Sequence, residues 1–311
     1  MKNSMKNSRK ELVKRIILIF LSSLLLSTVF LFYGPIKEFR EIWILTAMNT
    51  SNSKYLAEML YTQDYINEVL LQNKVVAIKE QTSDEIQKVN FGDGYSFEEI
   101  RERNFRGYLF TVDDPARLQL VRAPSGNGNL LGEIVGDSKV LVAMNASGYN
   151  MIARDVCAGL AIYNYEIRNM GKSTWHQIVG MDANNTLKVG TYSGTQIRTA
   201  KFRWAVEFGP VLIVNGKSTD LTKYAGGFAP RTAIGQTQEG KILMLVIDGR
   251  QLRSIGATFK DVQEILRSRG AINACNLDGG KSSAMYYQGR TINSPSEVNR
   301  RHNLPNALIV K

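Results

Sequence analysis

The sequence predicts an α+β protein, with a single mixed, mostly antiparallel sheet domain and few helices, preceded by an N-terminal transmembrane helix and a short helical stalk. Three observations predict this architecture. An uncharged apolar stretch covers residues 16–34, segments with helical spacing follow it, and from about residue 106 short β-rich runs alternate with Gly, Asn, Asp and Pro. The 311 residues are enough for one or two domains.

The apolar stretch 16–34 has the length that a helix needs to cross a bilayer. Residues 1–15 carry a net charge of +5, which by the positive-inside tendency places them in the cytoplasm. A cleaved signal peptide is the alternative, but aromatic residues stand where a small-x-small cleavage site would be expected. We therefore predict a basic cytoplasmic tail, an uncleaved signal anchor over residues 16–34, and an extracytoplasmic remainder.

The segment after the anchor, residues 35–105, is predicted to be a helical stalk and linker. Apolar residues recur there at helical spacing in two groups, which predicts two short amphipathic helices packing on the main domain. The groups are Tyr55, Leu56, Met59 and Leu60, and then Ile66, Val69 and Leu70. Residues 81–106 are charged and contain two glycines, so we expect a loop or spacer there.

The remaining residues, 106–311, are predicted to form the sheet domain. The candidate strands are 140–144, 158–163, 211–214, 231–235, 242–247, 271–277, 284–287 and 307–310. One helix interrupts them, because Thr258 can cap its start, Asp261 stands three residues on, and Gly270 fits its end.

Charge and cysteine content limit the function classes. Outside the tail the net charge is +6, a mildly basic surface that suits polyanionic surroundings, and no nucleic-acid-binding module accompanies it. The two cysteines, Cys157 and Cys275, form no C-x-x-C motif. A disulfide between them is open to a protein outside the cell, although Cys275 also fits a small apolar strand residue.

The segment 276–283, with the sequence NLDGGKSS, connects two apolar runs and combines a carboxylate, two glycines, a lysine and two hydroxyls. Such a connection offers backbone N–H groups, charge and hydroxyls to one small volume, as a site for an anionic, oxygen-rich substrate requires. The alternative is a polar glycine-rich turn. A nucleotide-binding P-loop is excluded, because Cys275 stands where that motif needs its first glycine.

Acid–base chemistry must fall mainly to carboxylates. The histidines, His176 and His302, have no partner at metal-ligand spacing, and no G-x-S-x-G motif is present. The best placed carboxylates are Asp248 and Asp278, each at the end of an apolar run and followed by glycine. Together with nearby carbonyls they could hold a hard divalent cation, but no run of ligands like an EF-hand loop exists, so no cofactor is predicted.

Two arginines and an asparagine also stand at predicted strand ends. Arg231 opens a strand and Arg250 follows Asp248 by two residues. An arginine can hold a phosphate through two parallel hydrogen bonds, although any single arginine is more often a surface residue. Asn145 ends the candidate strand 140–144.

Taken in order, these segments resemble the phosphodiester glycosidase family, the family of the mannose 6-phosphate uncovering enzyme and of many bacterial envelope proteins. The matching segments are AMNASGY (143–149), FGPVLIVNG (208–216), PRTAIG (230–235), VIDGR (246–250), NLDGGKSS (276–283), and Arg301 before 306–308. The resemblance spans about residues 107–311, and residues 45–72 also resemble the segment that precedes this domain in bacterial members.

The resemblance implies an α+β fold and the hydrolysis of a sugar-1-phosphate diester, which releases a sugar from a phosphate-linked partner. Independently of it, the apolar stretch predicts membrane attachment through residues 16–34, and no nucleic-acid partner is predicted. The resemblance also implies a pocket lined by Asn145, Arg231, Asp248, Asn276, Asp278, Gly279, Gly280 and Ser282. Lys281 departs from the family, which commonly has a small residue there, and adds a cation near the expected phosphate. The 143–149 segment also lacks the usual double glycine.

These residues suggest roles for a hydrolase acting in the metabolism of a cell-envelope glycopolymer or exopolysaccharide. We expect Asp278 to act as nucleophile or general base, and Asp248 to be its partner or to orient Arg250. Arg231, with Lys281 or Arg301, would bind the phosphate, and Gly279 and Gly280 would offer backbone N–H groups. The expected ligands of the sugar hydroxyls are Asn145, Asn276 and Ser282.

Two other functions stay open at this point. A membrane-anchored binding or assembly protein for an anionic envelope polymer would use the same basic surface and Lys281 without turnover. A glycosyl or phosphoryl transferase would use the same pocket with an acceptor other than water.

Overall fold

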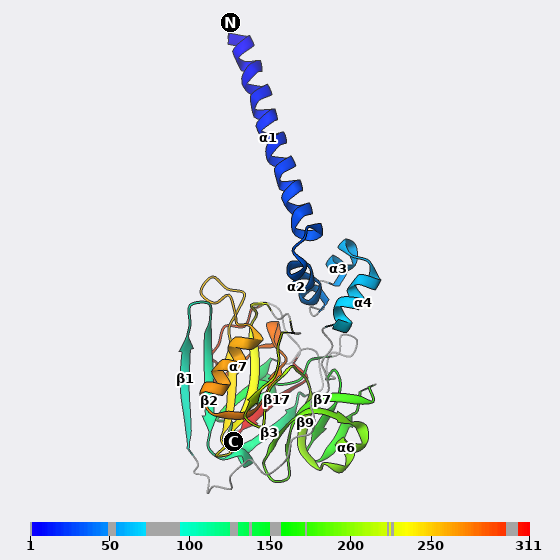
Figure 1. Ribbon diagram of the computed structural model, residues 1–311. Helices are drawn as coiled ribbons and strands as arrows, with labels where there is room; N and C mark the ends of the chain where they lie inside the picture. The colour runs from blue at the N-terminus through cyan, green and yellow to red at the C-terminus, as the bar shows by residue number, and fades with distance from the viewer. Residues whose placement is uncertain are drawn as a thin grey trace. The chain divides into compact units, whose positions relative to one another are not determined.

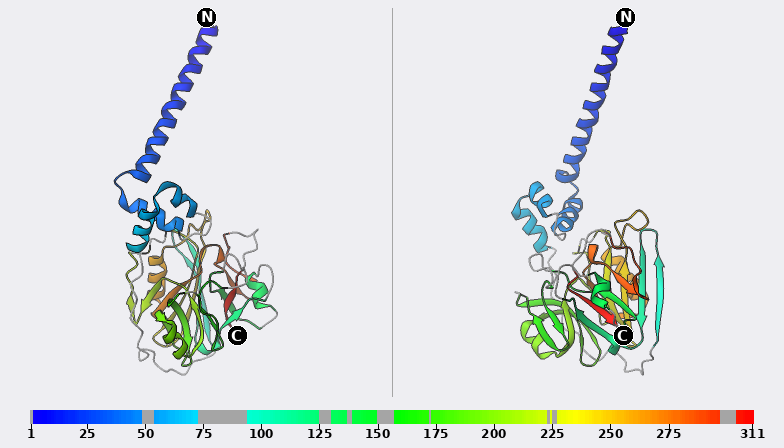
Figure 2. Two further views of the ribbon diagram at one scale, coloured as in Figure 1. Left: turned by 90° about the vertical axis from the view of Figure 1, so that its right-hand side faces the viewer. Right: turned by 180° about the vertical axis from the view of Figure 1, so that it is seen from behind.

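The computed structural model describes residues 2–48, 54–72, 94–124, 130–136, 139–149, 157–171, 173–222, 224, 227–296 and 304–311. The chain divides into two compact units, Met1–Lys74 and Val75–Lys311. The first unit is helical and the second is built mainly of strands (Figures 1 and 2).

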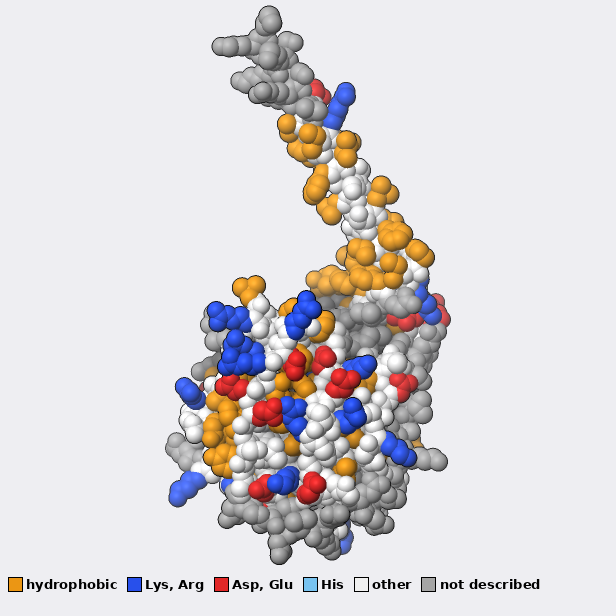
Figure 3. All heavy atoms as spheres, turned by 60° about the vertical axis from the view of Figure 1, so that its left-hand side comes forward, with side chains coloured by type: hydrophobic (Ala, Val, Ile, Leu, Met, Phe, Trp, Pro, Cys, Tyr) orange, Lys and Arg blue, Asp and Glu red, His pale blue; other side chains and the backbone are white. Residues whose placement is uncertain are grey.

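The first unit begins with a long helix, α1 (Lys2–Tyr33). Its part Val13–Tyr33 is long and apolar enough to cross a membrane, and none of it is buried inside the chain. Figure 3 shows apolar side chains along the exposed surface of this helix. The helix ends where Gly34 and Pro35 follow, because proline cannot continue the backbone hydrogen bonding.

Three shorter helices complete the first unit: α2 (Lys37–Met48), α3 (Lys54–Leu60) and α4 (Gln63–Gln72). The predicted pair of amphipathic helices is confirmed by α3 and α4, whereas α2 was not predicted. Two tyrosine hydroxyls fasten the end of α1 to this group. Tyr33 Oη donates to the Leu60 carbonyl at 2.9 Å, and Tyr61 Oη donates to the Phe32 carbonyl at 3.0 Å.

The strands of the second unit form three sheets, in which each strand pairing is antiparallel within the described residues. Sheet A contains, in spatial order, β1 (Tyr95–Arg101), β2 (Arg106–Val112), β13 (Ile242–Ile247), β12 (Arg231–Thr237), β14 (Ala271–Leu277), β10 (Val211–Val214) and β11 (Lys217–Ser218). Sheet B contains β16 (Arg290–Thr291), β15 (Met285–Tyr287), β4 (Val142–Asn145), β17 (Asn306–Val310) and β3 (Leu118–Arg122). Sheet C contains β6 (Glu166–Asn169), β5 (Ala161–Tyr163), β9 (Phe202–Glu207), β7 (Trp175–Asp182) and β8 (Leu187–Ser193).

The three sheets share one central core, to which each contributes alternate residues from the face that looks inward. Phe110 of sheet A, Met144 of sheet B and Trp204 of sheet C all belong to it. The outer faces bear smaller apolar clusters covered by α7 (Phe259–Ser268) on sheet A, α5 (Leu131–Val135) on sheet B and α6 (Gly194–Thr199) on sheet C. Figure 1 shows α7 lying across the strands of sheet A.

The structure confirms the α+β class and the eight predicted strands, with boundaries that differ by up to three residues. The predicted helix is α7: Thr258 Oγ1 accepts a hydrogen bond from the Asp261 N–H at 3.2 Å, and the Asp261 carboxylate accepts from the Thr258 N–H at 2.7 Å. The expectation of a loop over 81–106 is wrong for residues 95–101, which form β1. That strand lies at the edge of sheet A with six of its seven side chains exposed, so its charged residues mark an edge strand and not a loop.

Candidate active site

The candidate site lies at the end of sheet A where β12 begins and β13 and β14 end. Thr232 on β12 pairs with Leu277 on β14, so Arg231 and Asp278 occupy the next position in the same register. Arg231 also pairs with Ile247, the last residue of β13. Antiparallel pairing therefore brings together residues that are 47 positions apart in the sequence (Arg231 and Asp278), and the predicted convergence at strand ends has a structural basis.

The Asn145 side chain joins this end of sheet A to sheet B. Its Nδ2 donates to the Asp278 carbonyl at 2.6 Å, while its Oδ1 accepts from Thr232 Oγ1 at 2.9 Å and from the Ala284 N–H at 3.1 Å. The residue is completely buried. Its amide oxygen thus accepts two hydrogen bonds within the protein, so a sugar hydroxyl donating to that oxygen would have to replace one of them.

Asp278 has the environment expected of a catalytic carboxylate. Burial raises the pKa of its carboxyl to about 7, and hydrogen bonds from the Ser282 hydroxyl and the Gly279 N–H partly oppose that shift. The residue as a whole keeps some exposed surface, although the carboxyl group itself is surrounded by protein. The causes of this shift among the described residues include no cation, and a carboxyl with a pKa of about 7 can exchange a proton near neutral pH.

Glycines let the loop after β14 approach its neighbours closely. A side-chain carbon at Gly279 would lie 2.9 Å from the Pro230 carbonyl oxygen, and Gly280 has a left-handed backbone with φ +63°. The Gly280 N–H donates to the same Pro230 carbonyl at 2.9 Å. The short 3-10 helix η3 (Gly280–Ser282) follows, so the Gly280 N–H holds the loop in place and is not directed at a ligand.

Arg231 is buried on the face of sheet A that α7 covers. Its Nε donates to the Ala257 carbonyl at 3.0 Å, its Nη2 donates to the Gly227 carbonyl at 2.7 Å, and its Cζ lies 3.9 Å above the ring of Phe259. Burial, and then the nearby charge of Arg250, lower the pKa of Arg231 to about 10. The guanidinium therefore stays charged at neutral pH, and its position is fixed.

Arg250 is exposed and its guanidinium lies beside the glycine loop, where a side-chain carbon at Gly280 would be 3.5 Å from Arg250 Nη2. Two guanidinium groups are thus close enough to repel each other next to the loop that carries Asp278. Lys281 is partly exposed within η3. Arg301, the other predicted phosphate ligand, lies outside the described residues.

The Asp248 carboxylate is hydrogen-bonded to the segment 293–294. Its carboxylate accepts hydrogen bonds from Asn293 Nδ2 at 3.0 Å and from the Ser294 N–H at 3.0 Å, and the residue is 4% exposed. Burial raises the pKa of Asp248, against the effect of these bonds. Among the described residues it forms no ion pair with Arg250 and no contact with the Asp278 carboxyl. Its observed contacts fix the 293–294 segment.

Ser282 and Asn276 complete the set of predicted residues. Ser282 is buried and hydrogen-bonds to the Asp278 carboxyl. Asn276 Nδ2 donates to the Gly209 carbonyl at 3.0 Å and to the Leu277 carbonyl at 2.8 Å. Thr232 and Phe259, which position Asn145 and Arg231, were not predicted as site residues, although Thr232 lies in a segment that carried the resemblance.

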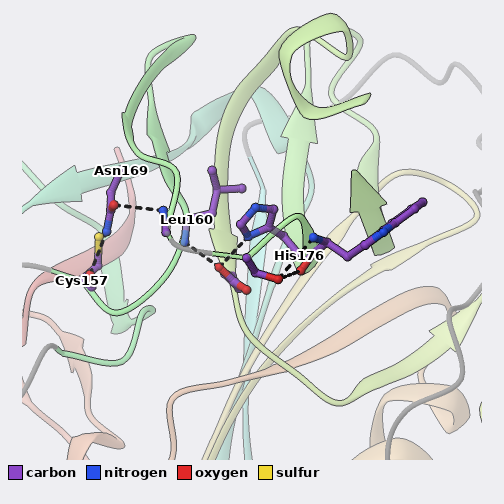
Figure 4. A network of polar contacts seen from close by, with 8 residues as sticks. Cys157, Leu160, Asn169 and His176 are labelled. Atoms are coloured by element: carbon purple, nitrogen blue, oxygen red, sulfur yellow. Dashed lines mark hydrogen bonds and ion pairs between the residues drawn. The ribbon is translucent and has the colours of Figure 1, made fainter. Parts of the chain in front are cut away.

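No metal site is evident within the described part of the chain, where no group of three or more His, Cys, Asp or Glu side chains converges. Both cysteines are buried free thiols. His176 is instead part of a polar network in sheet C, where His176 Nδ1 and the Leu160 N–H both contact the Glu207 carboxylate, at 2.9 and 2.8 Å (Figure 4). Asn169 Nδ2 also donates to the Cys157 carbonyl at 3.1 Å in this region.

Fold and site together define an α+β protein in which the buried Asp278 carboxyl, whose pKa is raised, and two guanidinium groups lie at the end of an antiparallel sheet. Residues 138–311, more than half of the chain, match the family model described as phosphodiester glycosidase. The chain belongs to the phosphodiester glycosidase family.

Individual relatives agree with this assignment. The mouse and human N-acetylglucosamine-1-phosphodiester alpha-N-acetylglucosaminidases are each 24% identical to it, over 220 and 223 residues, or 63% and 64% of this chain. The chain spans about two fifths of the length of these relatives, 42% and 43%. The SPbeta prophage-derived uncharacterized protein YomE of Bacillus subtilis (strain 168) is 46% identical over 68 residues, 22% of this chain and 11% of that protein.

A solved structure shares the fold. It is the zebrafish N-acetylglucosamine-1-phosphodiester alpha-N-acetylglucosaminidase catalytic domain, described as auto-inhibited by its pro-peptide. The superposition has a TM-score of 0.60 at 20% identity and covers 77% of this chain and 90% of that chain.

We predict that Asp278→Asn changes how stability depends on pH. An unfolded aspartate ionises near its pKa of 3.8, whereas the folded Asp278 has a pKa of about 7, so the wild-type fold is favoured below pH 4 and loses stability as the pH rises through 7. Asparagine cannot ionise and removes this loss. In urea denaturation, the variant should gain about 2 kcal/mol over wild type between pH 5 and pH 8. A stability difference that does not vary with pH would contradict the raised pKa.

Proposed function

We propose that the chain is a membrane-anchored extracytoplasmic hydrolase that cleaves a sugar-1-phosphate diester. The observation that carries the proposal is the juxtaposition of Asp278, whose pKa is raised to about 7, with the loop flanked by Arg231 and Arg250. Family membership supports the same reaction class.

The two guanidinium groups fit the phosphate half of such a substrate. Burial, and then the charge of Arg250, lower the pKa of Arg231, and an anion bound between the two guanidinium groups would relieve their repulsion. Arg231 is held by Phe259 and two carbonyls, so it offers a preorganised charge, whereas the exposed Arg250 can adjust to the ligand. Lys281, partly exposed in η3, adds a third cation on the same loop.

Asp278 would promote substitution at the anomeric carbon of the sugar. As a general base it takes a proton from water while the water oxygen bonds to the anomeric carbon and the bond to the phosphate oxygen breaks. As a nucleophile, its own oxygen bonds to the anomeric carbon while the bond to the phosphate oxygen breaks, and water then replaces the carboxylate oxygen on that carbon and releases the sugar. A phosphate is a weakly basic leaving group, so neither route requires a strong acid from the protein. Both routes need the ionised carboxylate.

Asp278→Asn should reduce release of sugar from a glycosyl phosphodiester by at least about 100-fold, because asparagine can neither bond to the anomeric carbon nor take a proton. Wild-type turnover should rise with pH through about 7, following ionisation of Asp278. Asp113→Asn, a change in a partly exposed ion pair with Lys241, is the matched control and should keep normal turnover. Near-equal rates for the Asp278 variant, with circular dichroism showing an intact fold, would refute the catalytic role.

Arg250→Ala should raise KM for the diester about 10-fold and weaken inhibition by inorganic phosphate to a similar degree, since one charged hydrogen-bond donor to phosphate is lost. Arg253→Ala removes the same charge from an exposed position three residues away and should change neither constant. Equal effects of the two variants would show that only net charge matters, and would remove Arg250 from the phosphate site.

The membrane location is part of the proposal. The apolar part of α1 supports a signal anchor, with residues 1–15 in the cytoplasm, α2–α4 as a stalk and the sheet unit outside. In a bacterial host the full chain should resist carbonate extraction from membranes, and added protease should degrade the sheet unit in cells stripped of their outer layers. Release of a shortened chain into the medium would identify a cleaved signal peptide instead.

The natural substrate would then be a glycopolymer or exopolysaccharide of the cell envelope, which the mildly basic remainder of the chain suits. Retention of the protein on such a polymer, without turnover of any phosphodiester, would favour a binding or assembly role. Transfer of the sugar to an acceptor other than water would identify a transferase.

A further inference from the structure

The connection between β13 and α7 contains a short hairpin, residues 250–255, at the edge of the candidate site. The Gln251 N–H donates to the Ser254 carbonyl at 2.9 Å and the Ser254 N–H donates to the Gln251 carbonyl at 3.1 Å, so Leu252 and Arg253 form a two-residue tip. In Figure 1 this connection is the gold loop that projects past the ends of β1 and β2. Asn, Asp and Gly are the residues that such a tip favours, so turn chemistry does not explain a leucine and an arginine there.

The base of the hairpin is fixed to the sheet, so the tip keeps its position. The buried Ser254 hydroxyl donates to the Asp248 carbonyl at 2.6 Å and accepts from the Arg106 N–H at 3.0 Å. The Ile255 N–H donates to the Asn104 carbonyl at 2.8 Å. The side chains at the tip are therefore presented to the surroundings by a supported backbone.

Large apolar side chains are exposed on this hairpin and on the segment next to it. Leu252 is 107% exposed, the highest value among the large apolar side chains in the described part of the chain, and Ile255 is 54% exposed. Phe228 is 50% exposed and precedes Ala229, which pairs with Ala257 just after the hairpin. An exposed leucine on a fixed tip indicates contact with an apolar partner.

Exposed arginines accompany these apolar side chains. Arg253 stands at the tip, and Arg103 and Arg106 flank the turn whose Asn104 carbonyl holds the hairpin, with Glu102 as an acidic neighbour. None of the three arginines forms an ion pair with another described residue. Figure 3 shows Lys and Arg side chains gathered near apolar ones at one end of the sheet unit. Cations around protruding apolar side chains suit the interface of a bilayer that contains anionic lipids.

The hairpin also adjoins the two guanidinium groups of the site. Arg250 is its first residue, has a left-handed backbone with φ +59°, and places its guanidinium beside Gly280. The carbonyl of Gly227, the residue before Phe228, accepts from Arg231 Nη2 at 2.7 Å. The exposed apolar residues therefore border the side of the site that is proposed to hold the phosphate.

The apolar helix α1 is the second feature that points to a bilayer. Its part Val13–Tyr33 is long and apolar enough to cross a membrane, and the sheet unit belongs to the same chain. Whatever its orientation, the sheet unit is thus tethered near the membrane that holds the helix. A bilayer surface is the partner that suits both the helix and the apolar, basic hairpin.

We propose that the hairpin docks on the surface of a bilayer that contains anionic lipids, and that the substrate is a sugar-1-phosphate diester whose alcohol half is a lipid of that bilayer. The inference rests on the proposed function and names the class of its substrate. The lipid chain stays in the membrane below Leu252 and Ile255, and the phosphate lies at Arg231 and Arg250. A glycopolymer joined through its phosphate to a lipid belongs to this class.

Hydrolysis of such a diester divides it between the two phases. The bond between the anomeric carbon and the phosphate oxygen breaks, and water supplies the hydroxyl of the released sugar and the proton that the phosphate or the solvent takes up. The lipid keeps its phosphate and stays in the bilayer, whereas the sugar leaves the membrane surface.

Two sets of diesters that differ only in the alcohol test the substrate class. The α-1-phosphates of glucose, galactose, mannose and N-acetylglucosamine are esterified to methanol in one set and to an oleyl chain in the other. The full chain is reconstituted into vesicles of phosphatidylcholine and phosphatidylglycerol, and released sugar is measured. Partitioning raises the local concentration of the oleyl diesters for every variant equally, so the comparison between variants decides.

Leu252→Asp should lower kcat/KM for the oleyl diesters about 10-fold, because a charged side chain does not enter the bilayer interface. Arg253→Glu should lower it about 5-fold, because it repels phosphatidylglycerol. Turnover of the methyl diesters should stay within about twofold in both variants. The matched controls are Leu130→Asp before α5 and Arg198→Glu on α6, both at exposed positions, which should leave both sets unchanged.

A fluorescent label reports the bilayer contact without any turnover. In Leu252→Cys the label attaches at the tip, because Cys157 and Cys275 are both buried. Its emission should be quenched by phosphatidylcholine that carries a nitroxide on its acyl chain. A label at Gln119→Cys, an exposed position on β3, should not be quenched.

Three results would overturn the inference. One is an equal loss of turnover for methyl and oleyl diesters in Leu252→Asp, which would assign the hairpin to the fold of the site. Another is oleyl turnover that neither hairpin variant changes. The third is crosslinking of Leu252→Cys between two copies of the chain without quenching by lipid, which would make the hairpin a contact between copies. Quenching at position 252 without turnover of any diester would refute the hydrolase function and leave the bilayer contact standing, and methyl turnover without quenching would do the reverse.

Discussion

The amide of Asn145 is the interaction on which the candidate site depends. One buried side chain accepts from Thr232 and Ala284 and donates to the Asp278 carbonyl, so a strand of sheet B fixes the ends of two strands of sheet A. Without a partner for each of its polar atoms, this junction would leave several buried groups unpaired. An asparagine can supply a donor and a two-fold acceptor at this spacing, which explains why an amide, and not an apolar residue, stands at the meeting point of two sheets.

The site combines features that each oppose folding. The Asp278 carboxyl is buried, the guanidinium groups of Arg231 and Arg250 repel each other, and Arg231 is mostly removed from water. The surrounding structure compensates with fixed contacts, including the ring of Phe259 under Arg231 and the Ser282 hydroxyl on Asp278. Such local cost at a site held by a well-packed core is the usual relation between activity and stability in enzymes. Here the core formed by three sheets supplies the compensation.

Much of this arrangement follows from the sequence. Uninterrupted apolar runs such as 242–247 and 271–277 predict buried strands, and the cap at Thr258 predicts the start of α7. Arg231 and Asp278 were predicted as site residues because each stands where such a run begins or ends, and strand pairing brings the two positions together. The division of strands among three sheets was not predictable, because it depends on pairings between distant segments. The hydrogen-bond partners of Asn145 and Asp248 were not predictable either, because a sequence does not reveal which distant polar groups are paired.

The strands β2 and β3 lie outside the segment that matches the family but inside the sheets of this fold. The segment that matches the family begins at residue 138, yet β2 is the neighbour of β13 in sheet A and β3 is the neighbour of β17 in sheet B. Phe110, Val112, Leu118 and Leu120, all on those two strands, belong to the central core. A gene fragment limited to the recognisable family segment would therefore leave β13 and β17 as new edge strands and remove these four side chains from the core. The smallest part of the chain that keeps both sheets intact therefore begins before residue 138. A transfer of this domain between proteins must include β2 and β3, although their sequences are less distinctive.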